Sequence, residues 1–544
     1  MSAAQLHTNL SIENGLQHSA VDEEQRVFKR QKQHNISSNG LAFFTEGKIN
    51  LLEERLGNKR VTEVLGKLEA ISASRRNVSL ENLFTAPLCN VDEFLSQQCP
   101  AERRALYIRT FFEDVHSIWP YLPRDAFEDA ATAPNLGSRL ESDYAWAATF
   151  YAVLSLGVLH EQGGSFAPLQ GPAWLIFQRA MKLFPFLLIA RKTVAVAQAL
   201  TTMALFALNY SSWSLEELLV TEAARICVAL HMNKISQPDE DADVYSRVFW
   251  TVYCLEKEYC FQSSSSTLTL EQTSSLDFGT LIAFCQLQSR AYKRLFSVSA
   301  LSNPREVICV QIDSLRNDLE AWKLSTPLGC RPGLPLPIAR LDIYLNCNTD
   351  VVRAAQSKTT LMEAARSIVE VVQLLPMEPS TPMNMLALAP VIATFILFEL
   401  IVFNPYHPGT PRNQAFLQIM AGYWVRLEVV SDGQVDGQLL AEFARISQEF
   451  LSKARPPEDH IVQQLRSPAA STTEQIVLSE DLTLHGERSA GGEIGVQPAI
   501  LQTANDVAGG DNFPLDFPLP DDWFENGMFG GELRFVDLFS KGLE

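Results

Sequence analysis

Hydrophobic residues recur at the spacing of an α-helix through the middle of the chain, and almost no stretch alternates as a β-strand would. Apolar positions three or four residues apart place their side chains on one face of a helix. The predicted helices span residues 101–116, 144–161, 173–184, 194–210, 214–234, 243–262, 281–297, 303–324, 341–356, 359–375, 384–403, 414–430 and 438–453. This pattern predicts an all-α fold.

Two of these helices, 194–210 and 214–234, carry apolar residues on nearly every face. A helix of this composition must be surrounded by other helices, which a single-layer bundle does not provide. We therefore expect one large multilayer helical domain over residues 101–455. No fixed-period repeat is present, so the sequence does not support a regular solenoid.

One apolar segment reaches the length of a membrane span. It reads MLALAPVIATFILFELIVF from Met385 to Phe403 and contains a single charged residue, Glu399. A span would place that carboxylate and the helix-breaking Pro390 in lipid, whereas a helix in a large α-helical core has the same composition without this cost. We interpret the segment as a core helix and expect no membrane partner.

A separate amphipathic segment precedes the main domain at residues 46–72. Apolar residues recur there every three to five positions between charged ones. The spacing resembles a short coiled coil, although Gly57 and Gly66 weaken a helix by up to about 1 kcal/mol each relative to alanine. The pattern fits two alternatives equally: the seam of a homodimer, or a helix that docks on its own domain.

The remaining segments are polar, and each has its own composition. Residues 1–45 predict a disordered arm whose basic run, Arg26 to Lys32, is either a nuclear-import signal or a solvated charge cluster. Residues 456–510 predict a disordered linker. Residues 511–544 interleave aromatic residues with eight acids against Arg534 and Lys541. That alternation is typical of activation tails that bind coactivators; the alternative is that the tail's aromatic residues dock on the α-domain.

Charge and cysteine content narrow the classes of function. The 544-residue chain has 44 Lys and Arg against 63 Asp and Glu, a net charge of −19, which argues against a chain-wide nucleic-acid footprint. Its nine cysteines form no Cys-x-x-Cys pair, and none precedes Cys89. Scattered cysteines of this kind indicate reduced thiols in an intracellular protein.

Sequence motifs of catalysis are sparse. The chain has no Gly-x-Ser-x-Gly elbow, phosphate-binding loop, dinucleotide fingerprint or His-Glu-x-x-His motif. Asp521-Asp522-Trp523-Phe524-Glu525 is similar to the first magnesium motif of all-α terpene cyclases but lies in a Pro-rich tail. His231 is interpreted as a capping or core-edge histidine. We expect no catalytic, cofactor-binding or metal-ligating residues and no cofactor; an all-α enzyme is the third-ranked class.

Several blocks of the α-domain, in order, resemble the fungal-specific transcription factor domain, the middle homology region of fungal zinc-cluster regulators. The blocks are FFEDVHSIWPYLP (residues 111–123) followed by Phe127, YAVLSLG (151–157), AQAL (197–200) through Trp213, AARICVALH (223–231) and RVFWTVY (247–253). They cover about residues 105–275. The family's Gly-Arg-Pro turn is replaced here by Ser263 to Thr267.

The resemblance implies a non-enzymatic transcriptional regulator in the nucleus, and one that controls a secondary-metabolism gene cluster. Family members carry an N-terminal six-cysteine zinc cluster, which the cysteine positions here do not supply. We therefore expect promoter DNA to be reached through a DNA-binding partner, with coactivators bound by the tail, and a small-molecule effector as a further implied partner. The alternative is a cytosolic helical ligand-binding or scaffold protein.

Overall fold

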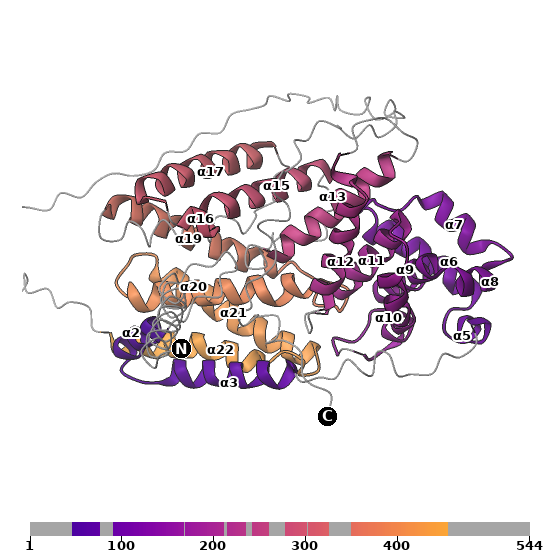
Figure 1. The fold of residues 1–544 in the computed structure, drawn as a ribbon. Coiled ribbons are helices and arrows are strands. Elements are labelled where there is room, and N and C mark those ends of the chain that lie inside the picture. The colour runs from indigo at the N-terminus through magenta and orange to yellow at the C-terminus, as the bar shows by residue number, and fades with distance from the viewer. Residues whose placement is uncertain are drawn as a thin grey trace, which may run out of the picture. The chain divides into compact units, whose positions relative to one another are not determined.

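The computed structural model describes residues 46–76, 91–167, 169–210, 215–234, 242–260, 278–301, 303–325 and 350–454. Every regular element within these ranges is a helix, as the sequence predicts (Figure 1). The arm at 1–45, the linker at 456–510 and the tail at 511–544 lie outside the described residues, so their predicted disorder and activation role stay predictions.

The first group of helices packs around α9, Tyr144–Gln162. α9 contacts α6 (Ala101–Thr110), α8 (Leu136–Ser142), α10 (Pro172–Ile189) and α11 (Val194–Ala207). Every α9 residue from Ala147 to Leu159 is buried, because neighbours cover all sides of the helix. α11 is also buried on nearly every face, as predicted, and it packs on α12 (Leu215–Ala229). The same expectation for α12 is wrong, because the buried residues of α12 lie mainly on one side.

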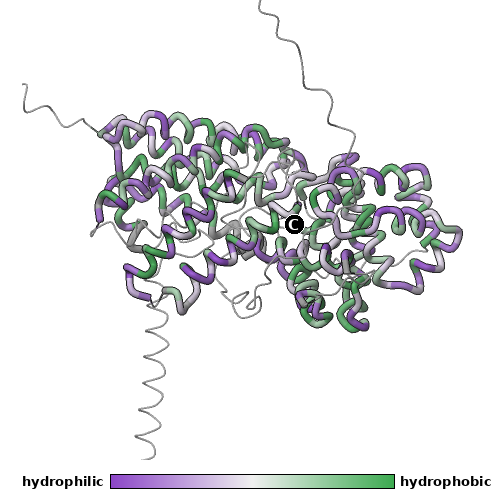
Figure 2. The backbone as a smooth tube through the Cα atoms, turned by 90° about the horizontal axis from the view of Figure 1, so that it is seen from above, coloured by the Kyte–Doolittle hydropathy of each residue, from purple (hydrophilic) through white to green (hydrophobic). Residues whose placement is uncertain are grey.

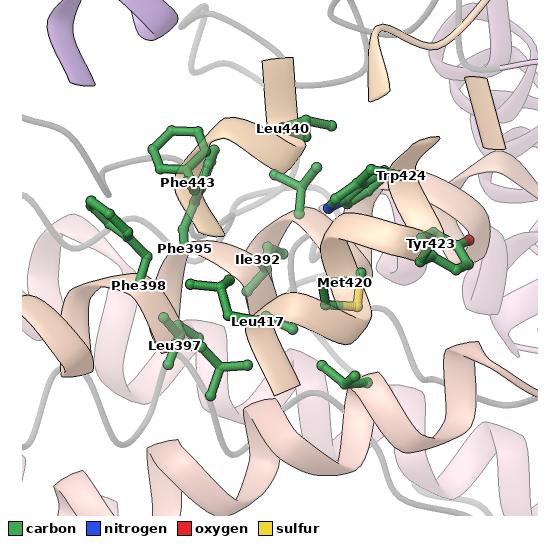
Figure 3. Packing of buried hydrophobic residues seen from close by; sticks show 14 of the residues in the cluster. Ile392, Phe395, Leu397, Phe398, Leu417, Met420, Tyr423, Trp424, Leu440 and Phe443 are labelled. Atoms are coloured by element: carbon green, nitrogen blue, oxygen red, sulfur yellow. The ribbon is translucent and has the colours of Figure 1, made fainter. Parts of the chain in front are cut away.

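The second group of helices consists of α19 (Val351–Val372), α20 (Ala389–Phe403), α21 (Thr410–Val430) and α22 (Gly437–Lys453). Figure 3 shows Ile392, Phe395, Leu397 and Phe398 of α20 meeting side chains of α21 and α22. The Phe443 ring of α22 packs edge-on against Phe395 and Phe398, with ring centroids 5.0 and 5.1 Å apart. These helices share one continuous hydrophobic cluster.

Two helices in the described ranges are long and apolar enough to cross a membrane, Pro172–Ile189 and Met385–Phe403. In the second, 83% of the residues are buried inside the protein, and in the first 50%. The Met385–Phe403 segment is thus a core element: most of a π-helical turn, Asn384–Leu388, followed by α20. Figure 2 shows hydrophobic and hydrophilic residues mixed along the described helices.

The amphipathic segment at 46–72 forms two helices, α2 (Glu46–Leu56) and α3 (Arg60–Arg76). They separate at Gly57, whose φ of +67° a glycine adopts without strain. The apolar positions of both helices are buried in the cluster of α20–α22; they are Leu52, Val61, Val64 and Leu68. In this structure, the segment docks on its own domain, and these four side chains are not free to form a dimer seam.

Three longer helices lie in the sequence between the two groups: α13 (Ala242–Cys260), α15 (Phe278–Ala291) and α17 (Arg305–Ser325). α13 packs on α11, α12 and α15, and α15 packs on α17. Helix termini agree with the predictions to within a few residues in most cases. The predicted break between residues 356 and 359 is wrong, because α19 runs unbroken from Val351 to Val372; the polar Ser357, Lys358 and Thr359 are compatible with a helix.

Four short helices were not predicted: α5 (Val91–Gln98), α7 (Arg124–Thr132), α8 and α16 (Val298–Leu301). Each has nine residues or fewer, which is too short for a clear periodic signal. α5 packs on α8, and its Phe94 lies edge-on to Tyr151 of α9, with ring centroids 6.2 Å apart. Packing onto the first group of helices therefore begins before residue 101.

Candidate functional site

The candidate site is the helical region that contains the sequence blocks between residues 111 and 253. Its first part is the end of α6. There the helix widens into a π-helical segment, Phe111–Val115, called η1. The π-turn adds one residue to the repeat, and such turns occur frequently at functional sites. Phe111 and Phe112 are buried, and the Phe112 ring packs edge-on against Phe127 at 5.7 Å between centroids. Phe127, which follows the turn after η1 in the chain, therefore anchors that turn against Phe112.

The turn after η1 is fastened to α11 by Tyr121. The Tyr121 hydroxyl donates a hydrogen bond to Oγ1 of Thr202 at 2.7 Å, and the Gln198 amide donates to the Tyr121 carbonyl at 3.2 Å. Tyr121 is completely buried, and burial raises its pKa, so the neutral hydroxyl is the stable form. This buried contact holds the turn against the centre of the helical group.

Replacing Tyr121 with phenylalanine is expected to lower the free energy of unfolding by about 1–2 kcal/mol. The Thr202 hydroxyl keeps its own bond to the Gln198 carbonyl, 2.7 Å long, so it loses only an incoming donor. Urea unfolding followed by circular dichroism measures the change. Tyr144→Phe is the matched control because Tyr144 is 45% exposed; equal stability losses in the two variants would contradict a stabilising role for the Tyr121 bond.

Two histidines at the edges of this region are kept neutral. Burial lowers the pKa of His116 to about 4, and its Nε2 accepts a hydrogen bond from the Leu122 amide at 3.3 Å. Burial also lowers the pKa of His160 to about 4, while a nearby glutamate, Glu378, acts in the opposite direction. The Asp114 carboxylate lies 3.8 Å from Nδ1 of His160, and burial raises the pKa of that carboxyl.

These histidines make stability depend on pH in a defined direction. In the unfolded chain both titrate near 6.5, so between pH 6.5 and 4 the unfolded state binds more protons and the folded state is disfavoured. We expect each to cost about 2 kcal/mol at pH 5 relative to pH 7. Unfolding by urea at pH 7, 6 and 5 measures this loss. The double variant His116→Asn/His160→Gln should flatten the profile; an unchanged slope would contradict the assignment.

The second block places Gly157 where α6 crosses α9. A Cβ at this position would lie 2.1 Å from the Tyr107 carbonyl oxygen and 2.6 Å from its carbonyl carbon. Tyr107 is itself buried, and its hydroxyl accepts a hydrogen bond from the Gln162 amide. The two backbones can approach this closely only because residue 157 has no side chain.

The Arg-x-Phe-Trp block lies in the middle of α13 and builds core structure. Phe249 and Trp250 are 1% and 7% exposed, and their rings meet edge-on with centroids 5.1 Å apart. Large aromatic residues on a predicted helix are expected to anchor a core, and the burial of both residues confirms this expectation. Arg247 pairs with Asp243 one turn earlier, at 2.9 Å between Nε and Oδ2, which stabilises the start of the helix.

Sequence reasoning missed a buried ion pair one turn after this block. Glu256 and Lys257 are 2% and 7% exposed, and Oε2 of Glu256 lies 2.7 Å from Nζ of Lys257. The Lys257 ammonium also lies 5.4 Å from the centre of the Tyr253 ring. Burial raises the pKa of Tyr253, and the Ser289 hydroxyl of α15 partly offsets this rise. The sequence signal that could have indicated this ion pair is the Glu-Lys dipeptide directly after the apolar run 248–255.

No group of three potential metal ligands occurs in the ranges that the structure describes. The buried Cys227 and Cys99 have thiol pKa values raised by burial to about 12, which keeps them protonated. His231 follows the end of α12 with a φ of +54°, and its amide donates a hydrogen bond to the Val228 carbonyl, as a C-terminal capping residue would. The expectation of no catalytic, cofactor or metal residues stays a prediction.

The geometry up to this point defines an all-helical domain built on buried aromatic anchors. Residues 108–273 match the fungal specific transcription factor domain, in the region where the sequence resembles that family.

Two proteins named ABC-transporter-regulating transcription factor are similar to the chain. The one from Aspergillus oryzae is 21% identical over 65% of this chain and 48% of its own length. The one from Aspergillus fumigatus is 20% identical over 68% of this chain and 49% of its own length. The chain thus spans about half the length of these relatives.

Proposed function

We propose that this protein regulates transcription in the nucleus of a fungal cell. The observation that carries the proposal is the match of residues 108–273 to the fungal specific transcription factor domain. The sequence blocks of this region lie on helices that pack on one another: α9 on α11, and α11 on α12 and α13. The names of the two Aspergillus relatives, which describe regulators of transcription, agree with it.

Within residues 1–544 no six-cysteine cluster occurs, and the net charge is −19. We therefore propose that this polypeptide associates with promoters through a DNA-binding partner. Its targets, as we propose them, are either ABC-transporter genes, after the relatives' names, or a secondary-metabolism gene cluster. Regulation by a small-molecule effector stays a prediction.

Chromatin immunoprecipitation of the tagged chain, followed by sequencing, tests this proposal and separates the two target sets. Enrichment at promoters of transporter genes favours the first set, and enrichment across one biosynthetic cluster favours the second. The matched control is a Gly157→Val chain, in which the α6–α9 contact is obstructed. A cytosolic wild-type protein with no enriched promoter under inducing conditions would favour the helical ligand-binding or scaffold alternative and overturn the proposal.

The acidic–aromatic tail is the proposed activating segment. Fused to an unrelated DNA-binding domain, residues 511–544 should raise expression of a reporter gene. The matched control replaces Trp523, Phe524 and Phe529 with alanine and keeps all eight acids; it should lose most of the signal, because coactivator grooves bind the aromatic side chains. A well-expressed fusion that leaves the reporter silent would remove the tail as an activator.

A further inference from the structure

The two helical groups contact each other largely through loops. Within the ranges that the structure describes, no helix of the first group packs extensively on α19, α20, α21 or α22. The contact comes from residues 163–167, which follow α9, and from residues 373–383, which precede the π-helical turn η4 (Asn384–Leu388). We call these two loops, together with the end of α11 at Leu208, the junction. A boundary without broad helix packing is a place where a fold can open locally.

Phe166 makes the apolar contact of the junction. It lies in the loop after α9, yet its side chain is only 9% exposed and belongs to the hydrophobic cluster of α19–α22. No other described residue between positions 69 and 360 belongs to that cluster. The loop begins at Gly163, with a φ of +70°, and ends at Gly171, with a φ of +86°. Glycine adopts these angles without strain, so both ends of the loop suit a change of direction.

The loop at 373–383 makes the contact in the opposite direction. The Met383 amide donates a hydrogen bond to the Leu208 carbonyl, 3.3 Å away, at the end of α11. Pro379 lies beside Gly164: a Cβ built on Gly164 would be 3.5 Å from the Pro379 Cβ. Each helical group therefore places one loop on the other, and neither loop is part of a packed helix face.

The junction also contains polar groups that are poorly satisfied when it is closed. The Tyr210 hydroxyl is buried 3.5 Å from the position of a Gly164 Cβ and has no acceptor among the described atoms. Close by in the chain, the buried and neutral His160 lies near the Glu378 carboxylate. Buried polar groups without partners destabilise a closed structure, and water that enters an opened junction would hydrate them. The closed state is therefore favoured chiefly by burial of Phe166.

On another side, α19 meets α17 through polar side chains. The Arg353 guanidinium donates hydrogen bonds to both carboxylate oxygens of Asp313, at 2.8 and 3.0 Å, and the Arg316 guanidinium donates to the Ser357 hydroxyl at 2.7 Å. The Asp313 side chain is 53% exposed. Ion pairs that water reaches can adjust to a small rotation without exposing apolar surface. This contact suits a pivot about which the second group turns.

We propose that the protein has a hinge at this junction, with Phe166 as its clasp. When Phe166 leaves the cluster, the first group and the second group, which includes α2 and α3, move apart as two bodies about the α17–α19 contact. The region 108–273 that matches the transcription factor domain stops before α19. The hinge therefore connects this region to the C-terminal helices, and a molecule that prefers the open or the closed state would shift both groups together.

Hydrogen exchange of the full chain, measured by mass spectrometry, tests the clasp. Burial of a phenylalanine side chain favours the closed state by about ten- to a hundred-fold. In Phe166→Ser, the amides of residues 373–383 should therefore exchange at least about ten-fold faster than in the wild type. The interiors of α9 and α20 should keep their exchange rates, because each group has its own core.

Phe186→Ser is the matched control, because Phe186 is 44% exposed and the same substitution there leaves the junction intact. Its residues 373–383 should exchange as in the wild type. Unchanged exchange of this segment in Phe166→Ser overturns the proposal. So does an equal acceleration in α9 and α20, which would mean general unfolding and not movement at a hinge.

A covalent lock provides an independent test. The Cβ separation of 3.5 Å between residues 164 and 379 suits a disulfide, so Gly164→Cys/Pro379→Cys should join the two loops on oxidation. The tip of Leu159, which would lie 2.6 Å from the new Cβ, is flexible and can move aside. The oxidised protein should exchange more slowly at 373–383 than the same protein after reduction, which controls for the substitutions.

The lock also separates a hinge from a local packing defect. Added to Phe166→Ser, the disulfide should return the exchange of residues 373–383 toward the wild-type rate, because it holds the two groups together without the phenylalanine. A fully formed disulfide that changes this exchange in neither background overturns the proposal.

Discussion

Replacing Gly157 with valine is expected to destabilise the protein by about 3–5 kcal/mol, close to the upper end for a single substitution. The new Cβ would lie 2.1 Å from the Tyr107 carbonyl oxygen, which belongs to the α6 backbone and not to a flexible side chain. The two helices must move apart to admit it. Such a shift exposes buried residues on both, including Ile108 and Val158.

Urea unfolding followed by helical circular dichroism measures this loss, with Gly66→Val as the control. Gly66 is an exposed helical glycine with open space, so the same substitution there adds a side chain without a clash. Gly157→Ala should fall between the wild type and Gly157→Val, since its single methyl already meets the carbonyl. Equal stability of Gly157→Val and the wild type would show that α6 and α9 do not cross at this distance.

Removing one partner of the buried Glu256–Lys257 pair is expected to cost about 3–5 kcal/mol. In Glu256→Leu, the Lys257 ammonium loses its carboxylate partner. It keeps its contact with the Tyr253 ring, whose centre lies 5.4 Å away. Burying a charge without a counter-ion requires either deprotonation or opening of the structure to water.

The double variant Glu256→Leu/Lys257→Met distinguishes a pair effect from a general loss of packing. Because both charges are removed and the volumes are similar, we expect most of the stability to return. A double-mutant cycle on the free energy of unfolding gives the coupling energy directly. Additive losses would mean that the two side chains act independently, and this outcome would contradict the ion pair.

The blocks that resemble the fungal transcription factor domain could be found from the sequence because each is a local feature. Large aromatic residues on a predicted helix, such as Phe249 and Trp250, are expected to be core anchors, and both are buried. The turn ending near Pro123 was visible because prolines interrupt the helical pattern. The bond from Tyr121 to Thr202 was not visible, because it joins residues 81 positions apart whose sequences carry no mark of each other.

The same distinction explains the segment at 46–72. Its amphipathic pattern predicted a helix but fitted a dimer seam and a docked helix equally, since an apolar stripe does not identify what covers it. The structure resolved this choice by burying Leu52 and Val61 in the cluster of α20–α22.

The sequence by itself determined that this protein is helical, where most helices begin and end, that Met385–Phe403 suits a core, and which family its middle region resembles. These properties follow from residue composition and from spacings within one or two helical turns. Only the tertiary structure decided that α6 and α9 touch at Gly157 and that Glu256 and Lys257 are buried together. Those facts depend on which surfaces meet across long sequence separations, and local patterning carries no information on such pairings.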